Sequence, residues 1–495
     1  MFQQKFAIVR AWPDGFEAAN MFMRTGSFHI DTRKAQAYKA WGRAELLCRA
    51  NHPNLKAEPM GRGFMRKVLL TIIAIGVGCV IGFSFGSNPW TVQGQGNSGS
   101  IAAVPGQIGG QDTFGAYEVA KDWPANISTL PGNEQWTWGA GQGIYAENPN
   151  RIFLLFRGEL PNIKRPESKL LTDFGPSLIF PIGRLPWRDA TVSALPGSGG
   201  TGQDPDDGPK NWMGGKGVVG TDAKWEHCLT IVDASGKIIE TFPQYDHLFK
   251  RPHFVTINPY DPEKHIWIVD DHMHAIYIFT HDMKTLVQTL GTPTVHGADG
   301  THFNRPTFLS WLPDSTLFVA DGYNGTRVAK FDKSGKFLMD WGMKGTPPND
   351  TRPYYMNNVH GVALDPQTKH VFVNDRGNHR VQVFDENGKY LYEFSMGREP
   401  SDIHLLYIGA DRMLWAYDRG TSRMLKYDLQ GHFLYSWGTW GDFAGGFWGV
   451  HGFSVDQDGN FYTAEVDNGR AQKFIPRPGA NPNYLVSKPL YAAWK

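Results

Sequence analysis

Short apolar runs alternate with polar turns through the C-terminal two thirds of this 495-residue chain. Five segments share one pattern: an apolar strand, an acidic or polar turn, then a basic residue and a second strand that ends in an aromatic side chain. They are 265–279, 316–331, 370–384, 412–427 and 460–474. Apolar runs of this length, bounded by turn residues, predict β-strands joined in hairpins.

The five segments recur at a nearly constant distance. When they are superposed, the anchor residues of the units are His274, Arg327, Arg380, Arg423 and Arg470, at spacings of 53, 53, 43 and 47 residues. This period suits one four-stranded blade of a β-propeller. A further segment, 141–158, opens with the same two strands and is followed by a Gly- and Pro-rich insertion at 159–225. The sequence therefore predicts an all-β, six-bladed propeller.

The pattern changes before the repeats. Residues 68–86 carry no charge and are about as long as the roughly 20 residues that a transmembrane helix needs. We therefore predict a single signal peptide or signal-anchor helix at 65–86, after a leader or cytoplasmic tail at 1–64. Residues 87–112 are rich in Gly, Ser and Gln and read as a flexible linker, so the propeller is predicted at 113–495.

Basic residues fix the orientation that we expect for the apolar segment. Arg62, Arg66 and Lys67 stand just before it, and no basic residue follows it closely. Positive charge marks the cytoplasmic side of a membrane helix. We therefore expect the propeller to be exported to the periplasm or the extracellular space, and to be either tethered to the membrane or secreted.

Composition excludes several classes of protein. The 49 Lys and Arg residues balance 48 Asp and Glu residues, which argues against disorder and against a surface built to bind nucleic acid. The three cysteines, Cys48, Cys79 and Cys228, are too few and too far apart for a disulfide framework or a structural zinc site. Because a propeller alone does not define a function, the function has to come from a site on it.

One repeat position carries the candidate chemistry. The residues that open the innermost strands of units two to six are His253, Thr307, His360, His404 and His451, and unit one has Gln142 or Gly143 there. Equivalent positions of a propeller converge on its central channel. One histidine at this position suits a packing role, but several that converge favour a metal ion such as zinc, which three imidazoles can bind with one position left open. His404 stands in a less typical sequence frame and is predicted to line the channel without binding the ion.

Two turns near the same channel add reactive groups. Tyr323 follows the first long strand of unit three, Arg376 occupies the corresponding turn of unit four, and Arg157 the comparable place in unit one. A phenol can move a proton, and two guanidinium groups can hold a carboxylate. Taken singly, each residue also suits a structural role, as a turn aromatic or as part of a surface ion pair.

The units resemble NHL repeats, most clearly at 360–365 and 378–384. From about residue 141 to 474, the chain also resembles peptidyl-α-hydroxyglycine α-amidating lyase, the second catalytic half of the peptide-amidating enzyme. The motifs that carry this resemblance follow one order along the chain: 156–158 (FRG), 252–253 (PH), 321–324 (DGYN), 359–360 (VH), 375–376 (DR) and 450–451 (VH).

The resemblance implies a role for each candidate residue. Three histidines would hold a catalytic zinc ion: His253, His360 and His451. Tyr323 would be the base, and two arginines would orient the substrate's carboxylate and its oxygen: Arg157 and Arg376. The implied reaction is the collapse of an N-acyl hemiaminal such as a peptidyl-α-hydroxyglycine, in which the C–N bond breaks to give a primary amide and glyoxylate. It needs no redox cofactor.

Two positions depart from the family. Gly452 stands where the family has an aspartate that binds a structural calcium ion, which argues against Ca²⁺ as a second cofactor. Asn324 follows the tyrosine where the family has a cysteine. No copper monooxygenase half is recognised in this sequence, so other N-acyl hemiaminals stay open as substrates.

Two other classes of function also stay open. A non-catalytic NHL propeller would bind a protein or a glycan on its face and would hold no zinc. A calcium-dependent propeller lactonase or esterase would need a channel lined by carboxylates, whereas histidines stand at the positions found here. For the lyase, the expected partners are a small molecule or peptide with a carboxylate and, through the N-terminal helix, the membrane, but not nucleic acid.

Overall fold

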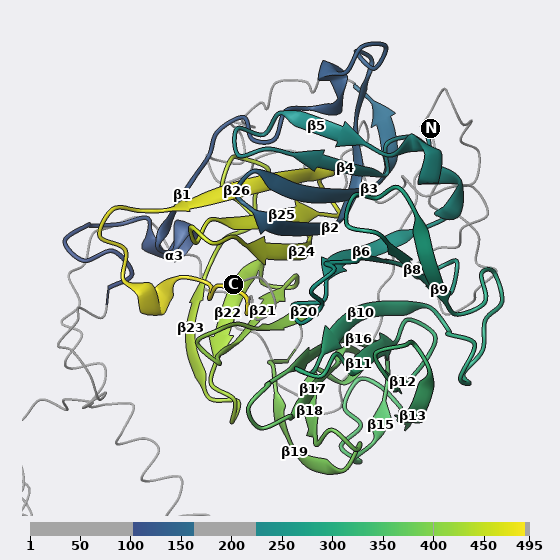
Figure 1. Ribbon diagram of the computed structural model, residues 1–495. Coiled ribbons are helices and arrows are strands. Elements are labelled where there is room, and N and C mark those ends of the chain that lie inside the picture. Colours follow the sequence, from purple (N-terminus) through teal and green to yellow (C-terminus); the bar gives the residue numbers. More distant parts are fainter. Residues whose placement is uncertain (1–101, 163–223, 399, 491–495) are drawn as a thin grey trace, which may run out of the picture. The chain divides into compact units, whose positions relative to one another are not determined.

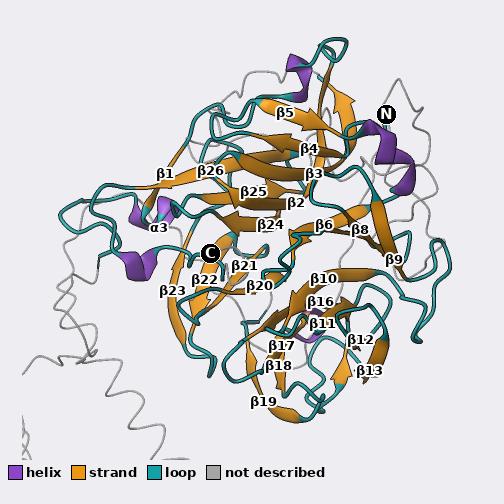
Figure 2. Ribbon diagram, viewed as in Figure 1, coloured by secondary structure: helices purple, strands orange, loops and turns teal. Residues whose placement is uncertain are grey.

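The computed structural model describes residues 102–162, 224–398 and 400–490. In these residues, six four-stranded antiparallel sheets are arranged around a common centre (Figures 1 and 2). We call the sheets blades A to F. The prediction of an all-β, six-bladed propeller is confirmed.

Five blades are built from consecutive strands, and in each blade the chain runs from the innermost strand outward. Blade A contains β2 (Trp136–Asn148), β3 (Arg151–Pro161), β4 (Leu229–Val232) and β5 (Ile238–Thr241). Blade B contains β6 (Pro252–Ile257), β7 (Ile266–Asp270), β8 (Ala275–Phe279) and β9 (Leu286–Leu290). Blade C contains β10 (Pro306–Trp311), β11 (Leu317–Asp321), β12 (Arg327–Phe331) and β13 (Phe337–Trp341). Blade D contains β16 (Val359–Leu364), β17 (Val371–Asp375), β18 (Arg380–Phe384) and β19 (Tyr390–Ser395). Blade E contains β20 (Ile403–Ile408), β21 (Leu414–Asp418), β22 (Arg423–Tyr427) and β23 (Phe433–Trp437).

Blade F closes the ring with strands from both ends of the described chain. Its first three strands are β24 (Val450–Val455), β25 (Phe461–Glu465) and β26 (Arg470–Pro476), and its outermost strand is β1 (Tyr117–Val119). Tyr117 pairs with Pro476 in this sheet. The innermost strands contact one another in a closed cycle, in the order β2, β6, β10, β16, β20, β24 and back to β2.

The remaining elements are short. They are α3 (Gln111–Phe114), the parallel pair β14 (Met343–Lys344) and β15 (Tyr355–Met356), and the 3₁₀ helices η1 (Ile127–Thr129), η5 (Pro243–Leu248), η6 (Arg376–Asn378) and η7 (Pro482–Tyr484). Of these, η6 matters most for function, because it begins with a candidate site residue.

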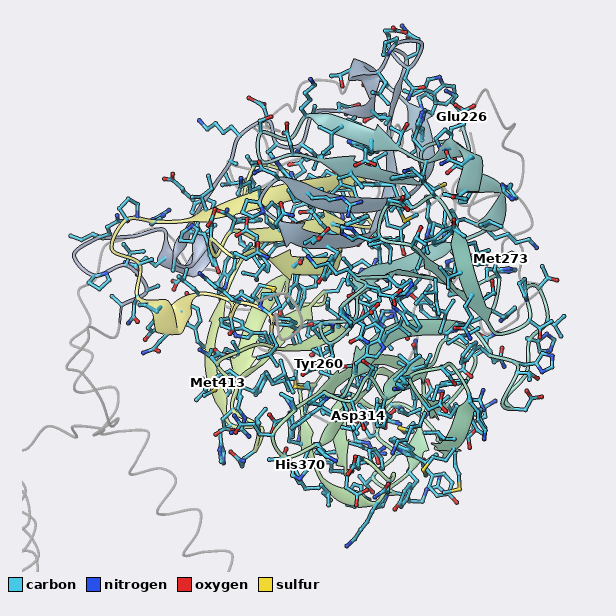
Figure 3. The ribbon with its side chains drawn as sticks, viewed as in Figure 1. Glu226, Tyr260, Met273, Asp314, His370 and Met413 are labelled. Atoms are coloured by element: carbon cyan, nitrogen blue, oxygen red, sulfur yellow. The ribbon has the colours of Figure 1, made fainter. Side chains whose placement is uncertain are left out.

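Apolar side chains hold neighbouring blades together. Six clusters of buried residues cover the six junctions between adjacent blades, and the cluster between blades E and F also includes Phe308 of blade C. Side chains fill the space between the sheets (Figure 3). The two middle strands of blade C are buried throughout, whereas its outermost strand β13 alternates between covered and exposed positions. This gradient explains the short apolar runs in the sequence, because a strand that is covered on both faces needs no polar side.

The strand register corrects one alignment of the repeats. In blades C to F an arginine opens the third strand, opposite the acid that ends the second: Asp321 and Arg327, Asp375 and Arg380, Asp418 and Arg423, Glu465 and Arg470. In blade B, Asp270 faces Ala275, not His274. The expectation that His274 is the equivalent anchor was therefore wrong by one position. The residue five after the acid is Arg380 in blade D and Ala275 in blade B, where the basic side chain stands one position earlier.

Several predictions on domain organisation lie outside the described residues. Among the residues that the structure describes, no helix is long and apolar enough to cross a membrane, and the apolar segment at 68–86 is not one of them. Most of the insertion at 159–225 lies outside as well, but its two ends meet: the backbones of Glu159 and Lys224 exchange two hydrogen bonds, of 2.8 and 2.9 Å. The domain boundaries stay a prediction.

Candidate functional site

Three histidines meet at the centre of the ring. His253, His360 and His451 are each the second residue of an innermost strand, β6, β16 and β24. All three are buried, and their candidate ligand nitrogens lie within 4.8 Å of one another. The ring centroids of His253 and His451 are 4.4 Å apart. The repeat thus places chemically identical side chains of three blades at one point, as the sequence predicts.

Backbone carbonyls set the orientation of each imidazole. His253 Nδ1 lies 3.1 Å from the carbonyl oxygen of Thr307, and His451 Nδ1 lies 2.9 Å from that of Gln142. His360 Nδ1 bonds to the carbonyl of His404 in the same way. Since a carbonyl can only accept, each Nδ1 carries the proton and each Nε2 keeps its lone pair. Such outer contacts are those that orient metal-binding histidines.

The histidines are neutral, as metal ligands must be. Burial lowers the pKa of His253 and His360 well below the usual value, with neighbouring cationic groups adding to the effect. Burial also lowers the pKa of His451 to about 3. His451 Nε2 is buried and has no hydrogen-bond partner among the described residues. An unpaired acceptor beside two similar ones fits a cation, so the three histidines can bind a metal ion.

Tyr323 lies against this cluster. It stands in the turn between β11 and β12, and its hydroxyl is 3.2 Å from His253 Nε2 and 2.9 Å from His360 Nε2. The Arg305 guanidinium lies over its ring, 4.7 Å from the centroid, and that of Arg251 lies at 5.3 Å. The structure therefore brings together the phenol and the histidines that the sequence singled out.

His404 occupies a neighbouring position. Its ring centroid is 5.6 Å from that of His360 and 5.3 Å from that of His451. Its Nδ1 bonds to the Val450 carbonyl at 2.8 Å, and its Nε2 is 3.9 Å from an Asp402 oxygen. Within the described part of the chain, the close group of candidate ligands includes the other three histidines and not His404. This agrees with its expected place in the channel wall.

Arg157 is an interior residue and not part of a surface ion pair. It lies in β3, is 4% exposed, and donates from Nη2 to Gln142 Oε1 at 2.8 Å. Burial, with the nearby charge of Arg251, lowers its pKa to about 9, so it still carries a proton at neutral pH. Its Nε has no hydrogen-bond partner in the described ranges. Arg157 therefore keeps a donor for a ligand.

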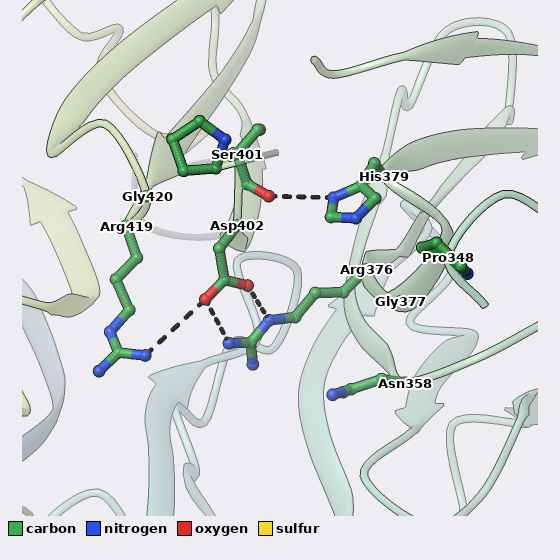
Figure 4. A pocket seen from close by; sticks show the side chains of 10 residues that line it. Pro348, Asn358, Arg376, Gly377, His379, Ser401, Asp402, Arg419 and Gly420 are labelled. Atoms are coloured by element: carbon green, nitrogen blue, oxygen red, sulfur yellow. Dashed lines mark hydrogen bonds and ion pairs between the residues drawn. The ribbon is translucent and has the colours of Figure 1, made fainter. Parts of the chain in front are cut away.

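Arg376, the first residue of η6, is held by a carboxylate. It donates from Nη2 to Asp402 Oδ2 at 2.8 Å and from Nε to the other oxygen (Figure 4). Burial acts to lower the pKa of Arg376, but the hydrogen bonds and the charge of Asp402 outweigh burial and raise it. Arg376 lines a cavity of about 530 Å³ together with Asn358 and Arg419.

Three charged residues beside Tyr323 were missed by the sequence analysis. Asp271 is fully buried and accepts from Arg305 Nε at 2.9 Å and Nη2 at 2.5 Å, while Arg251 Nε lies 3.4 Å from its other oxygen. Burial alone would raise the pKa of Asp271, but the arginines lower it to about 2. A signal was present: Arg-Pro occurs just before the channel position in both 251–253 (RPH) and 305–307 (RPT).

The charges around the centre do not cancel. Among the described residues, five arginines meet three aspartates here: Arg157, Arg251, Arg305, Arg376 and Arg419 with Asp271, Asp402 and Asp467. The histidines add no charge because they are neutral. Counted over the described part of the chain, the site therefore carries excess positive charge in a buried setting, which favours an anionic ligand.

Comparisons with known proteins agree with this architecture. The NHL repeat family matches residues 356–384. The chain is 29% identical over 280 residues to peptidyl-alpha-hydroxyglycine alpha-amidating lyase 1 of Drosophila melanogaster, over 52% of this chain and 50% of that protein. It is 31% identical over 180 residues to peptidyl-glycine alpha-amidating monooxygenase A of Xenopus laevis, over 35% of this chain and 19% of that protein. It is also 33% identical over 138 residues to NHL repeat-containing protein 3 of Homo sapiens, over 26% of this chain and 38% of that protein.

The chain is a six-bladed β-propeller with a buried three-histidine centre, and its residues 356–384 match the NHL repeat family. Within that class it resembles the peptidyl-α-hydroxyglycine α-amidating lyases. The matched segments span half or less of these relatives.

Proposed function

We propose that this protein is a zinc-dependent carbon–nitrogen lyase. Its substrate is an N-acyl hemiaminal such as a peptidyl-α-hydroxyglycine, and its products are an amide and glyoxylate. One observation carries the proposal: the hydroxyl of Tyr323 lies within hydrogen-bond distance of two of three neutral, buried imidazoles. The names of two relatives support the choice of reaction.

His253, His360 and His451 would hold the metal, and a zinc ion bound there supplies Lewis acidity at the substrate's hydroxyl oxygen. In its phenolate form, Tyr323 Oη would take the proton of that hydroxyl and return it to the departing amide nitrogen. The C–N electron pair leaves with the nitrogen as the carbonyl of glyoxylate forms. The protein therefore ends each turnover in its starting protonation state.

Two arginines would bind the anionic half of the substrate. Arg157 has a buried Nε without a partner in the described part of the chain, and Arg376 is oriented by Asp402. Guanidinium groups bind carboxylates through paired hydrogen bonds. We assign to Arg157 and Arg376 the orientation of the substrate's carboxylate and its oxygen, and the excess positive charge of the centre favours binding of this anion over a neutral analogue.

The direct test is metal analysis of the full-length protein together with an assay of glyoxylate release from an α-hydroxyglycine peptide. We expect one zinc per chain, which His360→Ala removes together with activity. Tyr323→Phe should keep the zinc and lower kcat by about 10² to 10⁴, the range typical of general acid–base residues. His404→Ala should keep the zinc. A chain with bound zinc that releases no glyoxylate would reject the substrate and keep the metal centre.

A non-catalytic propeller is the second candidate, because one relative is named for its repeats alone. In that case the purified chain holds no zinc, and Tyr323→Phe changes no activity. A calcium-dependent lactonase or esterase is less well supported, since three imidazoles, and not carboxylates, form the candidate ligand group.

We also propose that the propeller is exported and is tethered to the membrane or secreted. The proposal rests on the apolar segment at 68–86 and on the basic residues that precede it. Protease added to cells with a permeabilised outer envelope and an intact cytoplasmic membrane should then digest the propeller, and sequencing of the mature N-terminus should show whether the segment is cleaved. Protection from protease until the cytoplasmic membrane is broken would reject export.

A further inference from the structure

A second, smaller cavity borders Tyr323 and is lined by carboxamides. Its volume is about 210 Å³, and four asparagines form much of its wall: Asn304, Asn324, Asn357 and Asn358. A volume below the roughly 300 to 1,000 Å³ of a whole ligand pocket suits one part of a substrate. No role in the proposed reaction has been given to these residues.

Polar atoms of this pocket are buried without partners. In the described ranges, no hydrogen bond reaches Asn304 Oδ1, Asn358 Oδ1, or either side-chain atom of Asn324. A buried amide atom left unpaired costs about 1 to 3 kcal/mol. Such groups gathered in one cavity indicate a place where a ligand supplies the missing donors and acceptors.

The repeat fixes the position of the asparagines. The backbone N–H of Asn304 donates to Asp321 at 2.7 Å, and that of Asn357 donates to Asp375 at 2.8 Å. The carbonyl of Asn304 accepts from Gly325 N at 2.8 Å. Two acids at the ends of second strands thus hold the backbone that presents the carboxamides, so the pocket is preformed.

The two cavities differ in charge and share one residue. Asn358 lines both, and in the larger cavity its side chain lies beside Arg376, which reaches toward Asp402 (Figure 4). The larger cavity has Arg376 and Arg419 and suits the carboxylate half of the substrate. Four of the nine residues that line the smaller cavity are asparagines, and its only basic lining residues among those described, Lys344 and His296, are exposed. It suits a neutral, hydrogen-bonding group.

We propose that the asparagine pocket, formed by Asn304, Asn324, Asn357 and Asn358, binds an amide group in the acyl half of the substrate. This inference rests on the proposed lyase function. A carboxamide offers one acceptor and two donors, which match the C=O and N–H of another amide. The chain should therefore prefer acyl groups that carry an amide, whether peptidyl or carbamoyl, over hydrocarbon acyl groups.

The test compares kcat/KM for three substrates of the full-length protein. They are N-acetylalanyl-α-hydroxyglycine, with a peptide amide; carbamoyl-α-hydroxyglycine, with a terminal carboxamide; and benzoyl-α-hydroxyglycine, with neither. We expect one or both amide-bearing substrates to exceed the benzoyl compound by about tenfold, the effect of one or two hydrogen bonds. The two amide substrates separate a peptide from a carbamoyl ligand.

Substitutions locate the preference. Asn324→Leu should bring the ratio of kcat/KM values close to one, and Asn304→Leu provides the same test should the first variant fold poorly. Asn150→Leu is the matched control, since Asn150 is exposed in the β2–β3 turn, and it should leave all three values unchanged. Equal use of amide and hydrocarbon substrates by the unaltered protein would overturn the proposal, as would a preference that survives both variants.

Binding gives a readout that does not need turnover. N-acetylalaninamide is the amide product of the peptide substrate, and urea is that of the carbamoyl substrate. The product of the preferred substrate should bind in calorimetric titrations, and Asn324→Leu should weaken that binding by about tenfold. Absence of glyoxylate from every substrate would reject the lyase function, while product binding would still report on the pocket. Glyoxylate release without any amide preference would reject the pocket alone.

Discussion

Blades B and C differ in the groups that bind the buried acid at the end of their second strand. In blade C, the acid that ends the second strand, Asp321, pairs with Arg327 Nε at 2.8 Å. Arg327 also reaches Asp340 at 2.5 Å and the carbonyl of His302 at 2.7 Å. One guanidinium thus ties the second, third and fourth strands to the loop that precedes β10, the innermost strand of the same blade. Blade D repeats this design with Arg380.

In blade B, Ala275 stands opposite Asp270, so the acid has no such arginine. Four backbone N–H groups bond to its carboxylate instead: those of Lys250, Arg251, His272 and Met273. Burial and the charge of Asp271 raise the pKa of Asp270 to about 7. The next residue, Asp271, binds the arginines beside Tyr323. In blades C and D, which follow the repeat, the ion pair of the acid joins strands of the blade. In blade B, which departs from the repeat, the additional acid Asp271 binds arginines at the centre of the ring.

The largest effect is expected from breaking the ion pair of blade C. Arg327→Met leaves the fully buried Asp321 without its charged partner. Loss of one member of a buried pair costs about 3 to 5 kcal/mol. We expect this decrease in the free energy of unfolding, measured by urea titration at pH 8.

The double variant Arg327→Met with Asp321→Asn sharpens the result. Removal of the orphaned charge should recover part of the lost stability, since the cost arises from an unpaired carboxylate. If the double variant is as unstable as the single one, the loss comes from packing of the arginine stem and not from charge.

The second prediction concerns pH and separates the two blades directly. Burial raises the pKa of Asp270 to about 7 and that of Asp321 to about 6, from an ordinary value of 3.8. Between its ordinary and its raised pKa, each of these two carboxyls binds more protons in the folded chain than in the unfolded chain. Both carboxyls therefore lower the free energy of unfolding as the pH rises from about 4 to 7. A pKa difference of one between the folded and unfolded chains corresponds to about 1.4 kcal/mol, so Asp270 should contribute more than Asp321.

Asp270→Asn tests this assignment. Since asparagine does not titrate, the variant's unfolding free energy should fall less steeply between pH 4 and 7, even though lost backbone contacts lower the whole curve. Parallel curves for the variant and the unaltered protein would show that Asp270 is ionised throughout this range and would contradict the comparison.

Much of the fold was predictable because the repeat encodes it. The spacing of the anchors indicated six blades, and the position that opens each innermost strand identified His253, His360 and His451. The alignment failed at His274, because blade B has Ala275 where blades C to F have an arginine, and the histidine one position earlier changes neither the apolar pattern nor the approximate period. Only the pairing of Asp270 with Ala275 reveals it.

The site was predictable only in part. The sequence could single out Tyr323 from its turn, but not the contact of its hydroxyl with two imidazoles, which depends on how blades B, C and D meet. It missed Arg251 and Arg305, although both precede a proline at equivalent positions, because an arginine in one unit alone suits the surface. Their function depends on Asp271, which comes from a third segment.

The smallest effect is expected in blade E, whose contacts are intermediate between those of blade B and those of blade C. Arg423 opens the third strand opposite Asp418, but in the described part of the chain no ion pair joins them, and Arg423 Nη1 reaches only Ser436 Oγ at 3.5 Å. Thr421 and two backbone N–H groups bond to Asp418 instead. Arg423→Met should therefore cost less than about 1 kcal/mol, as for an exposed charge. A loss in urea titrations as large as that of Arg327→Met would mean that the arginine stem stabilises blades C and E alike, and the contrast between blades B and C would then rest on packing and not on charge.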